Sequence, residues 1–142
     1  MQALEQLFKK QTDSLDAIFA FLSDAGKAMA LPEELMPMLH LVVEEIFVNL
    51  VRYNTESCND VTVRMSCEGR TLTITLVDRD VDGYDLTRHA DVDTTRPAHE
   101  RRPGGLGIHL VREMMDEVRY AHENRTSTIT LIKHLGAADV ES

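Results

Sequence analysis

The sequence predicts an α/β sandwich of the α+β class, in which helices cover one face of an antiparallel or mixed sheet. Two long segments, residues 14–29 and 31–54, carry apolar side chains at helical spacing. Four short segments alternate between apolar and polar residues and are joined in pairs by turns, as β-hairpins are. These four expected strands are residues 60–66, 71–77, 118–122 and 127–135. Hairpins interspersed with amphipathic helices favour two packed layers.

The N-terminal region contributes one ambiguous segment and one clear helix. Residues 4–10 are compatible with a short edge strand, but their pattern does not decide the matter. Residues 14–29 are predicted to be helical because Leu15, Ile18 and Leu22 recur on one face, and Ser14 is a plausible N-cap.

The second helix has two possible starts. Pro32 suits a first turn, and the acids that follow it face the positive end of the helix dipole. Pro37 would remove a hydrogen bond from a helix that had already begun. The helix therefore either begins near Pro37 or kinks there, and it runs to about residue 54.

The second half of the chain contains a long polar stretch. Residues 78–103 have no periodic pattern, and loops of this length are usually lids, binding loops or disordered segments. A short helix over 107–116 is expected to follow. The 142 residues are predicted to form one domain over 1–135, with a flexible tail at 136–142.

Composition narrows the classes of function. The net charge of −9 disfavours nucleic-acid binding; it is compatible with a basic protein partner and equally with a role in solubility alone. Cys58 and Cys67 form no disulfide framework, which favours a reducing, cytoplasmic setting. We expect no membrane span and no export signal, since no apolar run approaches the ~20 residues of a span.

A glycine-rich loop precedes the short third helix. Gly104, Gly105 and Gly107 would let backbone N–H groups approach a ligand, and the helix that follows would point its positive end at a phosphate. The alternative is a glycine turn that merely caps a surface helix.

Three polar residues lie on one stripe of the second helix, apart from its apolar face. These residues are Glu45, Asn49 and Arg52. A carboxylate can orient or deprotonate a nucleophile, an amide oxygen is a suitable Mg²⁺ ligand, and a guanidinium neutralises phosphate. The alternative is an ordinary solvated stripe.

Together these motifs resemble a known family. The segment from Glu45 to Tyr53 is similar to the N-box of the GHKL ATPases, and residues 104–111 resemble their second glycine box. The form of that box, with the segments 114–120 and 128–133, is similar to the stand-alone bacterial anti-sigma-factor serine kinases. The resemblance extends from about residue 14 to residue 135.

The resemblance implies a Bergerat ATP-binding fold, with one mixed, mostly antiparallel sheet under helices, and a set of site residues. Asn49 would hold Mg²⁺, Glu45 would be the general base, and Arg52 would sit near the phosphates of ATP. Asp78 would accept from the adenine amino group, with Thr130 nearby. The glycine boxes would supply Gly83, Gly104, Gly105, Leu106, Gly107 and Ile108.

The same resemblance implies an activity. The protein would phosphorylate a serine or threonine of a small antagonist protein and would sequester a sigma factor or similar regulator. A homodimer is also implied.

One part of the pattern departs from the family. The first glycine box reads roughly Asp-x-Gly-x-Gly, but here Asp80 occupies the first glycine position and Gly83 comes one residue late. A one-residue insertion would reconcile the two patterns. The departure also allows an alternative function, in which the same fold serves as a partner-switching binding module with weak or no ATP turnover.

Metal sites are competing interpretations of several acids and histidines. Asp78, Asp80 and Asp82 match the start of an EF-hand loop, but His89 occupies the position of its final glutamate. His40 and Glu44 have a metal-binding spacing without an evident third ligand. His89, Asp91, Asp93 and His99 match the ligand types of a zinc site, and the simpler alternative is a charged lid.

Overall fold

The computed structural model describes residues 2–53, 59–82 and 105–136. Its strands are β1 (Gln2–Phe8), β2 (Val61–Glu68), β3 (Thr71–Arg79), β4 (Glu117–Glu123) and β5 (Thr126–His134). Its α-helices are α1 (Leu15–Ala28), α2 (Met36–Tyr53) and α3 (Gly105–Met114). Short 3-10 turns at Thr12–Ser14 and Glu33–Leu35 lead into α1 and α2.

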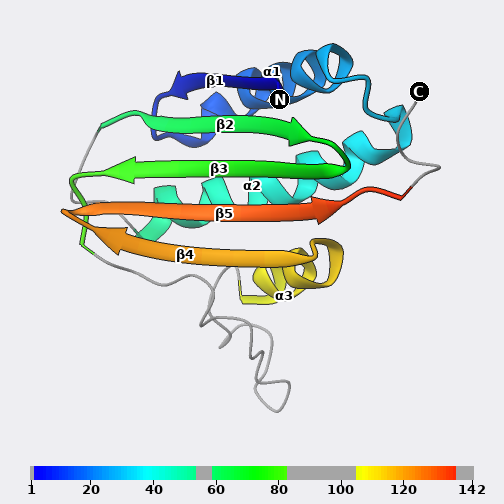
Figure 1. Ribbon diagram of the computed structural model, residues 1–142. Helices are drawn as coiled ribbons and strands as arrows, with labels where there is room; N and C mark the ends of the chain where they lie inside the picture. Colours follow the sequence, from blue (N-terminus) through cyan, green and yellow to red (C-terminus); the bar gives the residue numbers. More distant parts are fainter. Residues whose placement is uncertain (1, 54–58, 83–104, 137–142) are drawn as a thin grey trace.

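The strands form one sheet in the order β1-β2-β3-β5-β4, and each neighbouring pair is antiparallel (Figure 1). Both predicted hairpins, β2–β3 and β4–β5, are confirmed. The ambiguous N-terminal segment is indeed an edge strand, with Phe8 paired to Val61. Of the two sheet types that the sequence left open, the described strands form the antiparallel one.

Helices α1, α2 and α3 cover one face of this sheet, as predicted (Figure 1). The apolar stripe of α2 is completely buried, and it packs on the inward side chains of β2, β3 and β5. The inward residues of β3 are Leu72, Ile74, Leu76 and Asp78, while the intervening residues face the open side. Asp78 is therefore the polar end of an otherwise apolar row.

The start of α1 differs from the predicted capping by Ser14, whereas the start of α2 confirms the prediction of a helix that begins near Pro37. The Ser14 hydroxyl does not cap α1; it donates instead to the carbonyl of Lys9 at 2.8 Å, because the preceding 3-10 turn already carries the chain into the helix. Helix α2 begins at Met36, so Pro37 lies in its first turn, where its missing N–H leaves no bond unmade.

The predicted long loop and the predicted C-terminal tail fall mostly on residues that the structure does not describe. These are residues 83–104 of the loop and the tail beyond Gly136. In the described part, no helix is long and apolar enough to cross a membrane.

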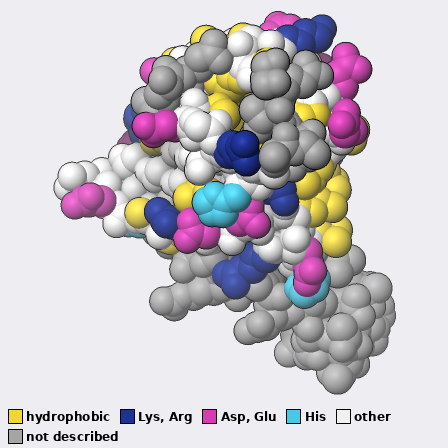
Figure 2. Space-filling view, turned by 45° about the vertical axis from the view of Figure 1, so that its right-hand side comes forward, with side chains coloured by type: hydrophobic (Ala, Val, Ile, Leu, Met, Phe, Trp, Pro, Cys, Tyr) yellow, Lys and Arg dark blue, Asp and Glu magenta, His cyan; other side chains and the backbone are white. Residues whose placement is uncertain are grey.

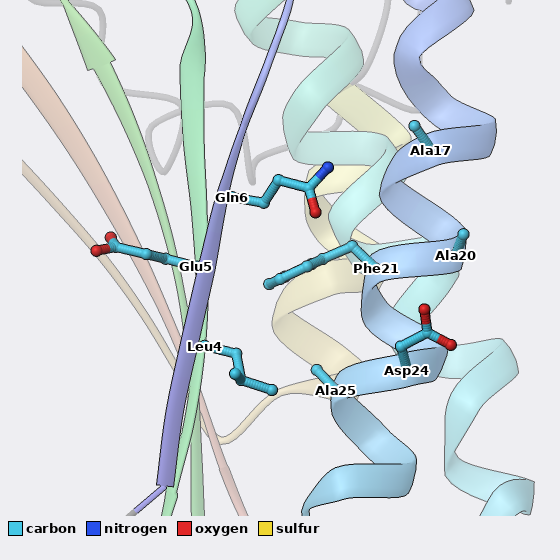
Figure 3. A pocket seen from close by; sticks show the side chains of 8 residues that line it. All are labelled: Leu4, Glu5, Gln6, Ala17, Ala20, Phe21, Asp24 and Ala25. Carbon is cyan, nitrogen blue, oxygen red and sulfur yellow. The ribbon is translucent and has the colours of Figure 1, made fainter.

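A pocket lies between the edge strand and the first helix. Leu4 and Gln6 of β1 face Ala17, Phe21 and Ala25 of α1 across it, whereas Glu5 points to the other side of the sheet (Figure 3). None of the residues predicted to carry chemistry lines this pocket.

Candidate functional site

Helix α2 places Asn49 and Glu45 one turn apart. Asn49 is 3% exposed, and its Nδ2 donates to the backbone carbonyl of Glu45 at 2.6 Å. The bond employs the amide nitrogen, so the amide oxygen, which is the atom suited to Mg²⁺, takes no part in it. Arg52 is exposed on the last turn of the same helix. The interpretation of a wholly solvated stripe therefore fails at Asn49.

Glu45 is only partly accessible, and its environment alters its acidity. Burial raises the pKa of Glu45, the neighbouring Glu44 raises that pKa further, and Arg52 acts in the opposite direction. A carboxylate with a raised pKa is a better proton acceptor than an ordinary glutamate at neutral pH. Such a group fits the role of base that the resemblance implied.

Asp78 ends the inward row of β3 and is fully buried. Its Oδ1 lies 2.8 Å from Nζ of Lys10, whose side chain is 4% exposed. Lys10 follows β1, and β2 separates β1 from β3 in the sheet, so the ion pair joins segments that are not neighbours in the strand order. Lys10 carries no sequence signal of this role, because a Lys9-Lys10 pair after an edge strand is typical of a solvated surface.

Thr130 does not lie beside Asp78. Strands β3 and β5 pair Asp78 with Ser127 and Thr75 with Thr130, so Thr130 occupies the open face of the sheet. The register therefore separates Thr130 from Asp78, and a role of Thr130 close to the base stays a prediction. Ser127 is fully buried, shares the inward face with Asp78, and lies 3.3 Å from the Tyr120 hydroxyl.

Hydrogen bonds and ion pairs join the segment after β3 to β4 and to the β4–β5 turn. Arg125 Nε donates to Asp80 Oδ1 at 3.1 Å, and Arg125 Nη1 donates to Asp82 Oδ1 at 2.8 Å. The Val81 amide donates to the Arg125 carbonyl at 2.9 Å, and His122 Nε2 donates to the Val81 carbonyl at 2.8 Å. These bonds fix the position of residues 80–82, the segment in which the sequence differs from the family's first glycine box.

Asp80 itself has a φ of +59°, in the left-handed region that favours glycine. The backbone at the first glycine position therefore has the conformation for which the family's glycine is suited. Aspartate tolerates it better than most residues, but at a cost.

The second glycine box begins α3. The helix starts at Gly105, two residues earlier than predicted, so Gly105, Leu106 and Gly107 form its first turn. Amide groups of a first turn have no partner within the helix and can donate to an anion. Ile108 is 1% exposed and anchors the helix in the core, next to α2. Gly83 and Gly104 lie outside the described residues.

The competing metal sites gain no support among the described residues. Asp78 contacts Lys10, whereas Asp80 and Asp82 contact Arg125, so the three acids do not converge on one cation. His40 stacks on Phe19 and lies 3.2 Å from the Ser23 hydroxyl. No group of three potential ligands occurs in the described part of the chain. The candidate ligands between His89 and His99 lie outside it.

One face of the molecule carries charges of both signs. Acidic side chains are interspersed with lysines and arginines there (Figure 2).

Comparisons with known proteins identify the family of the chain. Residues 8–133 match the profile of the histidine kinase-like ATPase domain. A curated relative, the serine-protein kinase RsbW of Bacillus velezensis, is 28% identical over 126 residues, covering 84% of this chain and 78% of the relative.

Solved structures share the fold. The RsbU and RsbW domains of a Mycobacterium tuberculosis protein superpose with a TM-score of 0.68 at 13% identity, covering all of this chain and 35% of that one. The histidine kinase AdeS of Acinetobacter baumannii gives a TM-score of 0.54 at 12% identity, covering 96% and 70%. The sheet, its one-sided helical layer and the profile match over most of the chain lead to one conclusion: the chain belongs to the histidine kinase-like ATPase domain family, and it is distantly related to RsbW.

Proposed function

We propose that this protein is an Mg-ATP-dependent serine/threonine kinase of the anti-sigma type, acting in the cytoplasm. Its substrate would be a hydroxyl of a small antagonist protein, and the same domain would sequester a sigma factor or similar regulator. Kinship with a serine-protein kinase at 28% identity supports the reaction class.

The observation that carries the proposal is the pairing of Asn49 and Glu45 on α2. The amide oxygen of Asn49 would bind Mg²⁺, and the buried hydrogen bond to Glu45 would keep that amide in one orientation. Glu45, whose pKa is raised, would accept the proton of the attacking hydroxyl. ATP would supply the γ-phosphoryl group.

Other residues would position the nucleotide. Asp78 and Ser127, which face inward side by side, are suited to the base. The first-turn N–H groups of Gly105, Leu106 and Gly107 are suited to the phosphates, with Arg52 close to them by analogy with the family. Gly83 and Gly104 are expected to complete the glycine boxes.

A calorimetric titration with Mg-ATP and Mg-ADP tests the site. Binding in the micromolar range that is lost or severely weakened by Asn49→Ala would support it. Thr130→Ala is the matched control, because Thr130 lies on the open face of the sheet and its removal should leave affinity unchanged. Equal affinity of the Asn49→Ala variant and the unmutated protein would contradict the assignment.

A second candidate function is a partner-switching module that turns over little or no ATP. The ion pairs of Arg125 with Asp80 and Asp82 favour it. They hold two acidic side chains in the segment where the family's first glycine box would place glycines close to the nucleotide. Absence of Mg-ATP binding by the unmutated protein would favour this candidate, and the search would then turn to protein partners.

A further inference from the structure

Lys10 and Asp78 form a donor–acceptor pair at the position proposed for the base. The ammonium group offers hydrogen-bond donors and the carboxylate offers acceptors, 2.8 Å apart and both buried. The inference below rests on the proposed function, in which Asp78 binds adenine.

We propose that Lys10 is a specificity-determining residue that donates to N1 of adenine while Asp78 accepts from the adjacent amino group. Adenine presents one donor and one acceptor side by side on this edge. Lys10 and Asp78, which already pair with each other, present the complementary donor and acceptor in the same immediate neighbourhood. Guanine in the same orientation would direct its carbonyl oxygen at the Asp78 carboxylate and its N1–H at the Lys10 ammonium, which is repulsive at both positions.

The cost of moving Lys10 away favours its retention in the bound state. A buried carboxylate that loses its cation is strongly destabilised, because nothing replaces the solvation that it has given up. The backbone also fixes where Lys10 begins: Phe8 pairs with Val61 at this end of the sheet, and the Ser14 hydroxyl and Gln11 amide both bind the Lys9 carbonyl at 2.8 Å. Lys10 is therefore held in register with Asp78 from both sides.

The test compares ATP with 1-deaza-ATP, which lacks the N1 acceptor but keeps the amino group. Titrations with Mg²⁺ are run on the unmutated protein and on Lys10→Met and Lys10→Gln. Lys9→Met is the matched control, since Lys9 is an exposed lysine one residue away. We expect the unmutated protein and Lys9→Met to bind 1-deaza-ATP roughly tenfold to a hundredfold more weakly than ATP.

In Lys10→Met that ratio should fall to about one, and in Lys10→Gln, which keeps an N–H donor, part of the discrimination should remain. Because the ratio is measured within each variant, a loss of stability does not alter its meaning. If Lys10→Met does not fold, the ratio in the unmutated protein and its reduction in Lys10→Gln decide the question.

Three results would overturn the inference. Equal affinity of the unmutated protein for ATP and 1-deaza-ATP, with Asn49-dependent binding intact, would overturn it alone and leave the proposed function standing. Tighter ATP binding by Lys10→Met with an unchanged ratio would show that Lys10 obstructs the base instead of binding it. Absence of all nucleotide binding would overturn the proposed function and the inference together.

Discussion

Lys10 and Asp78 join the segment that follows the first strand to the centre of the sheet through one buried ion pair of 2.8 Å. The two residues are far apart in sequence, and β2 lies between β1, which ends two residues before Lys10, and β3, which carries Asp78. Such a pair contributes little net stability compared with apolar side chains, but breaking it leaves an uncompensated charge. Removal of Lys10 should therefore lower the free energy of unfolding far more than removal of a surface lysine.

Lys10→Ala should lower the free energy of unfolding by about 3–5 kcal/mol, because Asp78 keeps its buried charge without a partner. Urea denaturation followed by circular dichroism measures the change. Lys9→Ala removes the same charge from an exposed neighbour and should change stability by less than about 0.5 kcal/mol. Similar effects of the two substitutions would mean that the Lys10–Asp78 pair is not formed in solution.

Asp80→Gly should stabilise the protein by about 1 kcal/mol, since glycine adopts a φ of +59° without strain. The ion pair lost to Arg125 is exposed and offsets little of this gain. We also expect tighter binding of Mg-ATP, because a negative charge is removed near the proposed nucleotide site. Thermal melting and calorimetric titration provide the two measurements.

Asp82→Gly is the control for this prediction. It removes the same charge and the other contact of Arg125, but φ at Asp82 is not positive, so no strain is relieved. An Asp80→Gly variant that is no more stable than Asp82→Gly would show that the left-handed backbone carries no appreciable strain.

Glu45→Gln should abolish phosphoryl transfer while raising stability at neutral pH. Burial and Glu44 raise the pKa of Glu45 in the folded protein above its unfolded value, so the folded state binds the proton more tightly. The ionised group therefore destabilises the fold above the raised pKa, and this penalty vanishes below the ordinary value of about 4.3. Melting temperatures of variant and unmutated protein should differ at pH 7 and converge near about pH 4.

The rate of transfer supplies the catalytic part of this test. If Glu45 is the base, kcat/KM should rise with pH through a pKa above that of an ordinary glutamate, and Glu44→Gln should retain activity. A Glu45→Gln variant with an unaltered rate would remove Glu45 from the mechanism. A Glu44→Gln variant should instead lower the pKa seen in the rate profile, because it removes a neighbouring charge.

Ser127→Ala should weaken Mg-ATP binding, whereas Thr130→Ala should not. Ser127 lies beside Asp78 on the inward face, and its removal also breaks the contact with the Tyr120 hydroxyl, at a cost of about 0.5–1.5 kcal/mol in stability. Calorimetric titration of both variants distinguishes the two faces of the sheet. The reverse outcome, with Thr130→Ala the weaker binder, would place the nucleotide on the open face.

Periodicity predicted the layers well because burial imposes it. The buried face of α2, including Leu39, Ile46 and Leu50, repeats at helical spacing, and the inward residues of β3 repeat at every second position. The same regularity identified both hairpins. Residues 4–10 lacked this regular alternation. Leu4 and Leu7 of this edge strand are both exposed, so their apolar side chains do not mark a buried face.

The site was only partly predictable, since it depends on register and on contacts between distant segments. Asn49 and Glu45 lie on one helix, so their spacing sufficed. Thr130 and Ser127 are three residues apart and face opposite sides of the sheet, which no local pattern reveals without the pairing to β3. Lys10 pairs with Asp78 although β2 separates β1 from β3, and a charged residue after an edge strand has no sequence signal that predicts burial.

The left-handed backbone at Asp80 also has a consequence at the level of the gene. Each aspartate codon is one base away from a glycine codon, and the φ of +59° at Asp80 is one that glycine adopts without strain. A single base change can therefore place a glycine at this position with no rebuilding of the main chain, so this turn is accessible to selection in one step.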